Sequence, residues 1–318
     1  MADLRTNVGT VDLPTPVLTA SGCAAAGREL APFVDLAAIG GVVTKSIMAE
    51  PRSGRPTPRM VETPSGMLNS IGLQGPGVGA FLAEDLPWLL AQGARAVVSL
   101  AGGSTAEYAH LARRLAQAWE DGLRPTAVEV NISCPNVANR GLVFACDPAS
   151  SAEVVRAVRD ALPPDLPTWA KLSPDVTDIV GIAAAALDAG ADGLSLVNTT
   201  LGLSIDHRTL RPTLGGVTGG LSGPAIRPVA LRCVYQVAAA FPDVPLVGIG
   251  GIRTGWDAVE FLAAGASAVQ VGTVIFNDPS APARVAEQIG LALDELGLGA
   301  VADVVGAAHR PRSGREGA

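Results

Sequence analysis

The feature that most constrains the fold of this chain is a regular alternation of two kinds of segment. Short apolar runs rich in Val, Ile and Leu are separated by Ala- and Leu-rich stretches of helical periodicity, a pattern typical of βαβ units around a parallel sheet. Strands are predicted at 17–20, 41–45, 96–100, 127–131, 168–171, 193–198, 245–249 and 268–271. Helices are predicted at 81–92, 106–121, 150–161, 177–189, 225–240, 256–264 and 282–296.

Nearly every predicted strand ends at, or just before, a polar residue or a glycine. A closed barrel brings these ends to one rim, whereas a doubly wound sheet would spread them along an edge. We therefore predict an α/β fold, a single-domain (β/α)8 TIM barrel over residues 1–306, with rim insertions at 46–80 and 199–224 and a disordered tail at 307–318. The strand-end residues are Ser21, Lys45, Ser99, Asn131, Lys171, Asn198, Gly250 and Gly272.

The amino-acid composition argues against several classes of binding partner for such a barrel. Hydrophobic residues make up 48% and charged residues 17%, which supplies a large core. A net charge of −7 makes nucleic acid and anionic membranes poor partners. No stretch resembles a signal peptide or a membrane span, and the scattered cysteines and histidines have no metal-ligand spacing. We expect a cytoplasmic protein with no metal site.

Two glycine-rich segments follow the last two predicted strands, VGIGGIRTG at 247–255 and AGASAVQVGT at 264–273. Glycines at such positions let backbone N–H groups approach an anion, and barrels often bind a phosphate there. Phosphate binding is predicted, the alternative being tight turns without a ligand. Neither segment is a GxGxxG in a Rossmann context, which argues against a dinucleotide fold.

Two lysines, Lys45 in VVTKS and Lys171 in WAKLSP, close apolar strands. Such a lysine could simply extend its stem along the rim. Two ammonium groups in one pocket would instead stabilise a ring that becomes electron-rich, such as a reduced flavin, or an anionic substrate. We favour this second interpretation.

The segment NISCPN at 131–136 carries the sharpest signal. Asn131 and Asn136 offer amide donors and acceptors that match the edge of a planar ring. Cys134 is presented by a proline-containing turn, and we predict that its thiolate is a general base, with activity rising through mildly alkaline pH. The alternative is a buried structural thiol.

Three further segments carry polar or glycine residues at predicted rim positions. MLNSIGLQGPG at 67–77 places Asn69 before a glycine-rich backbone, SLVNTT at 195–200 places Asn198 and Thr199 at a strand end, and GGLSGPAIRP at 219–228 opens onto a helix. Amide and hydroxyl groups of this kind can bind a ring or a carboxylate.

Taken together, VTKS, PRMVETPSGMLNSIGLQGPG, NISCPN, KLSP, VNTT, GGLSGPAIRPVALR and GIGGI…AGASAVQVGT resemble the dihydroorotate dehydrogenases. The class 1B, NAD-linked branch is the most similar, because cysteine occupies the position of the base. The resemblance implies an FMN-dependent oxidation of (S)-dihydroorotate to orotate in de novo pyrimidine biosynthesis, with Cys134 removing a proton from carbon 5 while carbon 6 passes hydride to the flavin.

The resemblance also implies two sets of site residues. FMN would contact Ser21, Lys45, Ser46, Ser99, Asn131, Lys171, Val197, Gly223, Gly250, Gly251, Gly272 and Thr273. Dihydroorotate would be held by Lys45, Asn69, Gly72, Leu73, Asn131, Asn136, Asn198 and Thr199. At Ser99 the family often has asparagine, so a water could replace a direct contact between this shorter side chain and the flavin.

The same resemblance implies partners. An electron-transfer subunit with FAD and a [2Fe–2S] cluster would pass electrons to NAD⁺, and a homodimer of barrels would lie within a heterotetramer. Alternatives are a fumarate-linked class 1A-like enzyme, a dihydropyrimidine dehydrogenase, a non-redox phosphate-binding barrel lyase or synthase, and a scaffold without activity. The lyase leaves NISCPN and the paired lysines unexplained, and the scaffold predicts missing polar rim residues.

Overall fold

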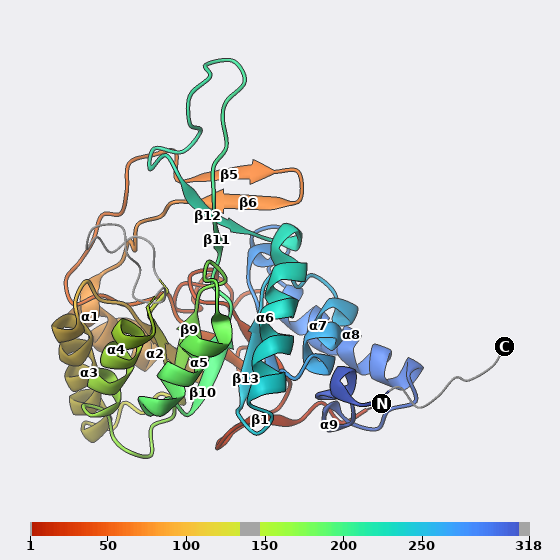
Figure 1. Ribbon diagram of the computed structural model, residues 1–318. Helices are drawn as coiled ribbons and strands as arrows, with labels where there is room; N and C mark the ends of the chain where they lie inside the picture. Colours follow the sequence, from red (N-terminus) through yellow and green to blue (C-terminus); the bar gives the residue numbers. More distant parts are fainter. Residues whose placement is uncertain (1, 134–146, 312–318) are drawn as a thin grey trace.

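Eight parallel strands form a closed barrel in the computed structural model, which describes residues 2–133 and 147–311 (Figure 1). Each barrel strand pairs with the next one along the chain, and β14 pairs with β3 to close the ring. The predicted (β/α)8 fold is confirmed. The strands are β3 (Val17–Thr19), β4 (Gly41–Val43), β7 (Ala96–Leu100), β8 (Ala127–Asn131), β9 (Thr168–Leu172), β10 (Gly193–Leu196), β13 (Leu246–Ile249) and β14 (Ala268–Val271).

The helices surround the barrel and match the predicted ranges closely. Several begin at side-chain caps, among them Ser104 and Asp178, and Thr254 forms a reciprocal capping box with Asp257. Residues 20–40, between β3 and β4, form turns rather than a helix. The main helices are α3 (Thr105–Glu120), α4 (Pro148–Arg159), α5 (Ile179–Asp188), α6 (Arg227–Ala240), α7 (Gly255–Ala263) and α8 (Ala281–Glu295).

Shorter helical segments complete the outer layer. α1 (Gly77–Ala80), η1 (Phe81–Asp85) and α2 (Leu86–Ala91) follow one another without a break, and η3 (Pro224–Ile226) leads into α6. η4 (Thr273–Phe276) follows β14, and α9 (Val301–Val304) and η5 (Ala307–His309) come after α8.

Apolar residues fill two regions, one between barrel and helices and one inside the amino-terminal half of the barrel. The inner region contains Leu18, Val43, Val97, Trp169 and Val247, all at most 1% exposed. Burying one such side chain contributes roughly 1.5–3 kcal/mol. A hairpin of β1 (Thr6–Val8) and β2 (Val11–Leu13) packs against this inner region and closes the lower end of the barrel.

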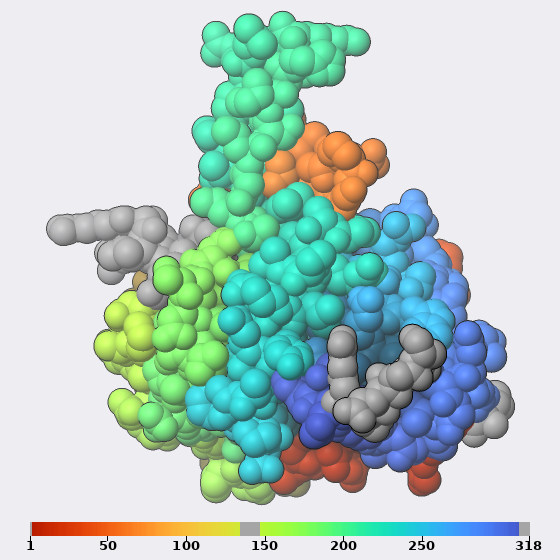
Figure 2. Space-filling view, turned by 45° about the vertical axis from the view of Figure 1, so that its right-hand side comes forward, coloured from red at the N-terminus to blue at the C-terminus, as the bar shows by residue number. Residues whose placement is uncertain are grey.

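The two rim insertions form one structure. β5 (Met60–Thr63) and β6 (Gly66–Asn69) come from the first, β11 (Thr200–Gly202) and β12 (Gly219–Ser222) from the second, and together they make a four-stranded antiparallel sheet in the order β11-β12-β6-β5. This sheet lies over the carboxyl end of the barrel, and the segment between β11 and β12 projects away from the body (Figures 1 and 2). The sequence located both insertions but not their pairing.

The segment predicted as a tail is partly packed. Residues 307–309 form η5, the His309 ring stacks on Tyr235 with 4.1 Å between centroids, and its Nε2 lies 2.9 Å from the Ala264 carbonyl oxygen. Residues 312–318 lie outside the described part of the chain. Within the described residues, no helix has the length and apolarity needed to cross a membrane.

Candidate active site

A cavity of about 960 Å³ opens at the carboxyl end of the barrel, beneath the insertion sheet. This volume lies in the range of ligand and cofactor sites. Its lining residues come from many segments between residues 20 and 284, as expected where parallel strands end together. The predicted site residues on its wall are Ser21, Lys45, Ser46, Asn69, Gly72, Leu73, Asn131, Lys171, Val197, Asn198, Thr199, Gly223, Gly250, Gly251, Gly272 and Thr273.

Of the predicted site residues that the structure describes, Ser99 is not on that wall. Cys134 and Asn136 lie outside the described residues. Ser99 is fully buried in β7 behind the wall, where its Oγ shares a 2.9 Å hydrogen bond with the Oγ of Ser46. Its side chain supports a cavity residue instead of facing the cavity.

The two predicted lysines converge on the cavity floor. The Lys171 Nζ lies 3.3 Å from a carboxylate oxygen of Glu129, and both side chains are buried. A Cβ added to Gly22, which has a φ of +88°, would lie 3.3 Å from the Lys45 Nζ, so a side chain there would be strained and crowd the lysine.

The pKa of the Cys23 thiol is sensitive to the two ammonium groups at this floor. Burial raises the pKa of its thiol to about 11, although the nearby Lys171 and Lys45 ammonium groups act to lower it. Both cations therefore lie close enough to one cavity atom to affect its ionisation. The Cys23 thiol stays protonated at neutral pH.

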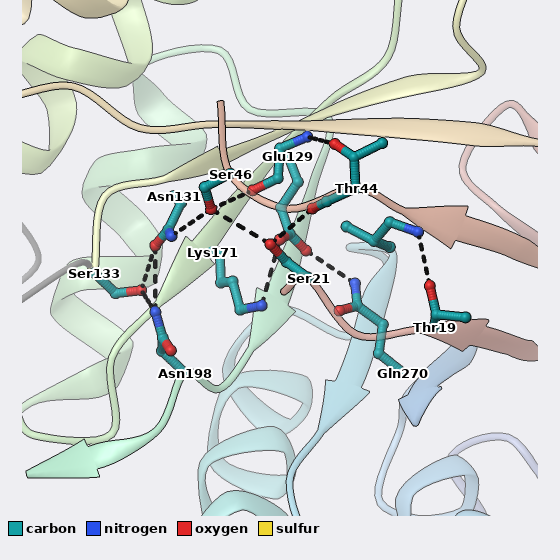
Figure 3. A network of polar contacts seen from close by, with 12 residues as sticks. Thr19, Ser21, Thr44, Ser46, Glu129, Asn131, Ser133, Lys171, Asn198 and Gln270 are labelled. Carbon is teal, nitrogen blue, oxygen red and sulfur yellow. Dashed lines mark hydrogen bonds and ion pairs between the residues drawn. The ribbon is translucent and has the colours of Figure 1, made fainter. Parts of the chain in front are cut away.

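Amide and hydroxyl groups form a continuous network along one wall (Figure 3). The Asn131 Nδ2 donates to the Ser46 Oγ at 2.9 Å. The Asn198 Nδ2 donates to the Ser133 Oγ at 2.7 Å and to the Asn131 Oδ1 at 3.2 Å. The Tyr108 hydroxyl of α3 donates to the Asn131 carbonyl at 2.7 Å. These bonds fix the orientation of both amides, so they present defined donors and acceptors to a ligand.

The insertion sheet supplies the upper wall. The Asn69 Nδ2 of β6 donates to the Gly220 carbonyl of β12 at 3.3 Å, which ties the two insertions together at the site. The Thr199 N–H donates to the Asn198 Oδ1 at 2.8 Å. Asp175 anchors the start of β11 through the Leu201 N–H at 2.8 Å and the Thr200 hydroxyl.

Glycines of the 219–228 loop and of the predicted phosphate-binding segment 247–255 meet at one side of the cavity. Gly223, Gly250 and Gly251 have φ values of +91°, +136° and +74°, a region that favours glycine. A Cβ on Gly251 would lie 2.7 Å from the Gly223 carbonyl oxygen. The two loops therefore pack backbone against backbone at the cavity wall.

The polar residues that the sequence analysis did not predict include two buried ones, Glu129 and Gln270. Glu129 is 0% exposed, and Gln270 is 1% exposed and lines the cavity. The Gln270 Nε2 donates to the second Glu129 oxygen at 2.9 Å. The sequence did contain a signal for both residues. Each is a polar residue within an apolar strand, two positions after an inward-facing alanine, Ala127 or Ala268.

A closed α/β barrel with a large cavity at the carboxyl ends of its strands has the architecture of a barrel enzyme. The sequence profile described as dihydroorotate dehydrogenase matches residues 3–293. This chain belongs to the dihydroorotate dehydrogenase family. It is therefore an oxidoreductase of a flavin-dependent family, which confirms the predicted enzyme class and rules out the lyase and scaffold alternatives.

Individual relatives are similar over nearly their full length. A protein of Pelobacter propionicus is 51% identical over 96% of this chain and 98% of its own. Proteins of Geotalea uraniireducens and Desulforudis audaxviator are each 50% identical, over 96% and 95% of this chain and 98% and 96% of their own. All three are named dihydroorotate dehydrogenase B (NAD(+)), catalytic subunit. The predicted resemblance to the NAD-linked branch is confirmed.

Proposed function

We propose that this protein is the catalytic subunit of an NAD-linked dihydroorotate dehydrogenase, which would hold FMN as the electron acceptor and oxidise (S)-dihydroorotate to orotate for pyrimidine synthesis. The observation that carries the proposal is the meeting of separate sequence motifs on one cavity, in a chain about half identical to relatives of that name.

The residues of the cavity fit FMN. Its volume of about 960 Å³ accommodates a tricyclic ring together with a substrate. The buried Gln270 Oε1 has no hydrogen-bond partner among the described residues, so it requires a hydrogen-bond donor from a ligand or a water. Lys171 and the glycine wall complement an electron-rich ring and a phosphate. The proposed FMN set is Ser21, Lys45, Ser46, Asn131, Lys171, Val197, Gly223, Gly250, Gly251, Gly272 and Thr273, with Ser99 acting through Ser46.

The amide network supplies a complementary surface for dihydroorotate. Asn131 and Asn198 are held in fixed orientations by their mutual hydrogen bond and by Ser133, so they bind ring N–H and carbonyl groups with little loss of side-chain entropy. Lys45 supplies a cation for the substrate carboxylate. The proposed substrate set is Lys45, Asn69, Gly72, Leu73, Asn131, Asn136, Asn198 and Thr199.

Cys134 is proposed as the general base that removes the proton from carbon 5. Cys23 is a poor candidate for that role, since burial raises the pKa of its thiol to about 11 and a base works best with a pKa near the operating pH. The proposal for Cys134 is supported by its place in NISCPN.

A second subunit completes the proposal. The relatives' names include the words catalytic subunit, which imply a partner. We propose a partner with FAD and a [2Fe–2S] cluster that passes electrons to NAD⁺, a homodimer of barrels within a heterotetramer, and a cytoplasmic location, which suits the free thiols of Cys23 and Cys233.

The visible spectrum of the purified chain tests the cofactor and substrate together. A flavin absorption band that bleaches on anaerobic addition of dihydroorotate is expected. A colourless protein after reconstitution with FMN, or a flavin band that dihydroorotate does not bleach, would contradict the proposal. Dihydrouracil serves as the matched substrate control and should not bleach the band.

The electron acceptor is tested separately. Rates are measured with NAD⁺, fumarate and a quinone, with and without the co-expressed partner. NAD⁺ reduction that requires the partner is expected. Full NAD⁺ activity from the isolated chain, or fast fumarate reduction, would point to another electron route.

A further inference from the structure

A fully buried carboxylate lies beneath the cavity floor and belongs to neither the proposed FMN set nor the proposed substrate set. Glu129, in the middle of β8, is 0% exposed and is not among the cavity-lining residues, but both of its partners are (Figure 3). One carboxylate oxygen lies 3.3 Å from the Lys171 Nζ, and the other accepts from the Gln270 Nε2 at 2.9 Å. The partners come from positions 42 and 141 residues away in the chain.

Barrel stability does not require a carboxylate at this position. Interiors of such barrels are filled mainly by branched apolar side chains, and the layer just below contains Ala127, Trp169 and Ala268. A buried ion pair is weak evidence for stability, because desolvation of both charges offsets their attraction. The charge at Glu129 is better explained by the two groups that it holds at the cavity floor.

Glu129 also determines the orientation of the Gln270 amide. A carboxylate only accepts hydrogen bonds, so the amide must turn its NH₂ group toward Glu129. The Gln270 Oε1 is thereby left as a buried acceptor without a partner in the described part of the chain. Glu129 thus presents one cation and one free acceptor to the same cavity.

We propose that Glu129 is a positioning residue that holds Lys171 and Gln270 against the bound flavin and limits the positive charge beneath it. This inference rests on the proposed function. The Glu129 carboxylate offsets the positive charge of the Lys171 ammonium group, with which it is paired at 3.3 Å. The carboxylate therefore disfavours the electron-rich reduced flavin relative to a neutral residue at this position.

The first test compares E129Q with the wild type and with E287Q, which makes the same charge change at an exposed position on α8. The flavin midpoint potential is measured by equilibration with a reference dye. E129Q should raise the ratio of reduced to oxidised flavin about tenfold at a given potential, equivalent to a shift of about +30 mV for a two-electron couple, and E129D should lie between E129Q and the wild type. E287Q should match the wild type.

An unchanged potential in E129Q would overturn the inference. Because wild-type bleaching by dihydroorotate is measured in the same preparations, a failure of the proposed function appears there instead. If E129Q does not retain FMN, the inference is tested by comparing the midpoints of thermal unfolding of K171M and K171M/E129Q. K171M leaves a buried carboxylate without its cation and should unfold at a lower temperature, and adding E129Q should restore part of the loss. Equal midpoints for the two variants would overturn the inference.

Discussion

Along five of its strands, the inside of this barrel has two layers that lie two residues apart, and the two layers have different roles. In the lower layer stand Val43, Val97, Ala127, Trp169 and Ala268, which pack against the closing hairpin. Two positions further on stand Lys45, Ser99, Glu129, Lys171 and Gln270, which form or support the cavity floor. The comparison indicates that one strand can supply stability at one inward position and chemistry at the next.

The largest effect is expected from removal of the proposed general base, Cys134. Cys134→Ala should lower kcat by about 10²- to 10⁴-fold, the usual contribution of a general base, while the flavin stays bound and the unfolding midpoint stays unchanged. Cys233→Ala, which alters a buried thiol on α6, is the matched control and should keep full turnover. Substantial activity in C134A would assign the base elsewhere.

For a substitution in the lower layer we expect a loss of stability instead. Trp169→Ala should lower the free energy of unfolding by about 3–5 kcal/mol, because it removes a large side chain that is 1% exposed. Urea unfolding measures the loss. Trp256→Ala is the control, since that ring is 46% exposed and its removal should change stability little. If W169A kept its stability but lost flavin, the two layers would not be separate.

Ser99 tests the boundary between the layers. Ser99→Ala removes its hydrogen bond to Ser46 and should cost roughly 0.5–1.5 kcal/mol of stability, with FMN affinity changed by no more than a few-fold. Fluorescence titration of the apoprotein with FMN measures that affinity. A loss of affinity well beyond tenfold would mean that Ser99 contacts the cofactor directly.

The smallest effect is expected at Cys23. Because burial raises the pKa of its thiol to about 11, roughly one thiol in a thousand is ionised at pH 8. Its alkylation by iodoacetamide, followed by mass spectrometry of its peptide, should be slow at pH 8 and rise about tenfold per pH unit up to the pKa. Rapid labelling at pH 8 would show a thiol of ordinary acidity. Turnover by C23S should keep the wild-type pH profile.

Much of the fold was predictable from the sequence because its signals are local. All eight barrel strands lie within two residues of the predicted ranges, and the helices follow the predicted periodicity. The turns of residues 20–40 and the pairing of β6 with β12 were not foreseen. The pairing depends on two insertions about 150 residues apart, and neither carries a sign of its partner.

In the site, too, the residues that could be predicted are those with a local signal in the sequence. Polar strand ends such as Lys45, Asn131 and Asn198 were found because they end apolar runs, and the structure brings these three to one cavity. Glu129 and Gln270 were missed because each lies inside a strand, where a single polar residue looks like an interruption of the pattern.

The sequence by itself determined the alternation of strands and helices and the polar character of the strand ends, since both depend on neighbours along the chain. Only the tertiary structure decided that Glu129 meets Lys171 and Gln270, and that Ser99 lies behind Ser46. Those contacts depend on the closure and register of the barrel, which set the distance between residues far apart in the chain.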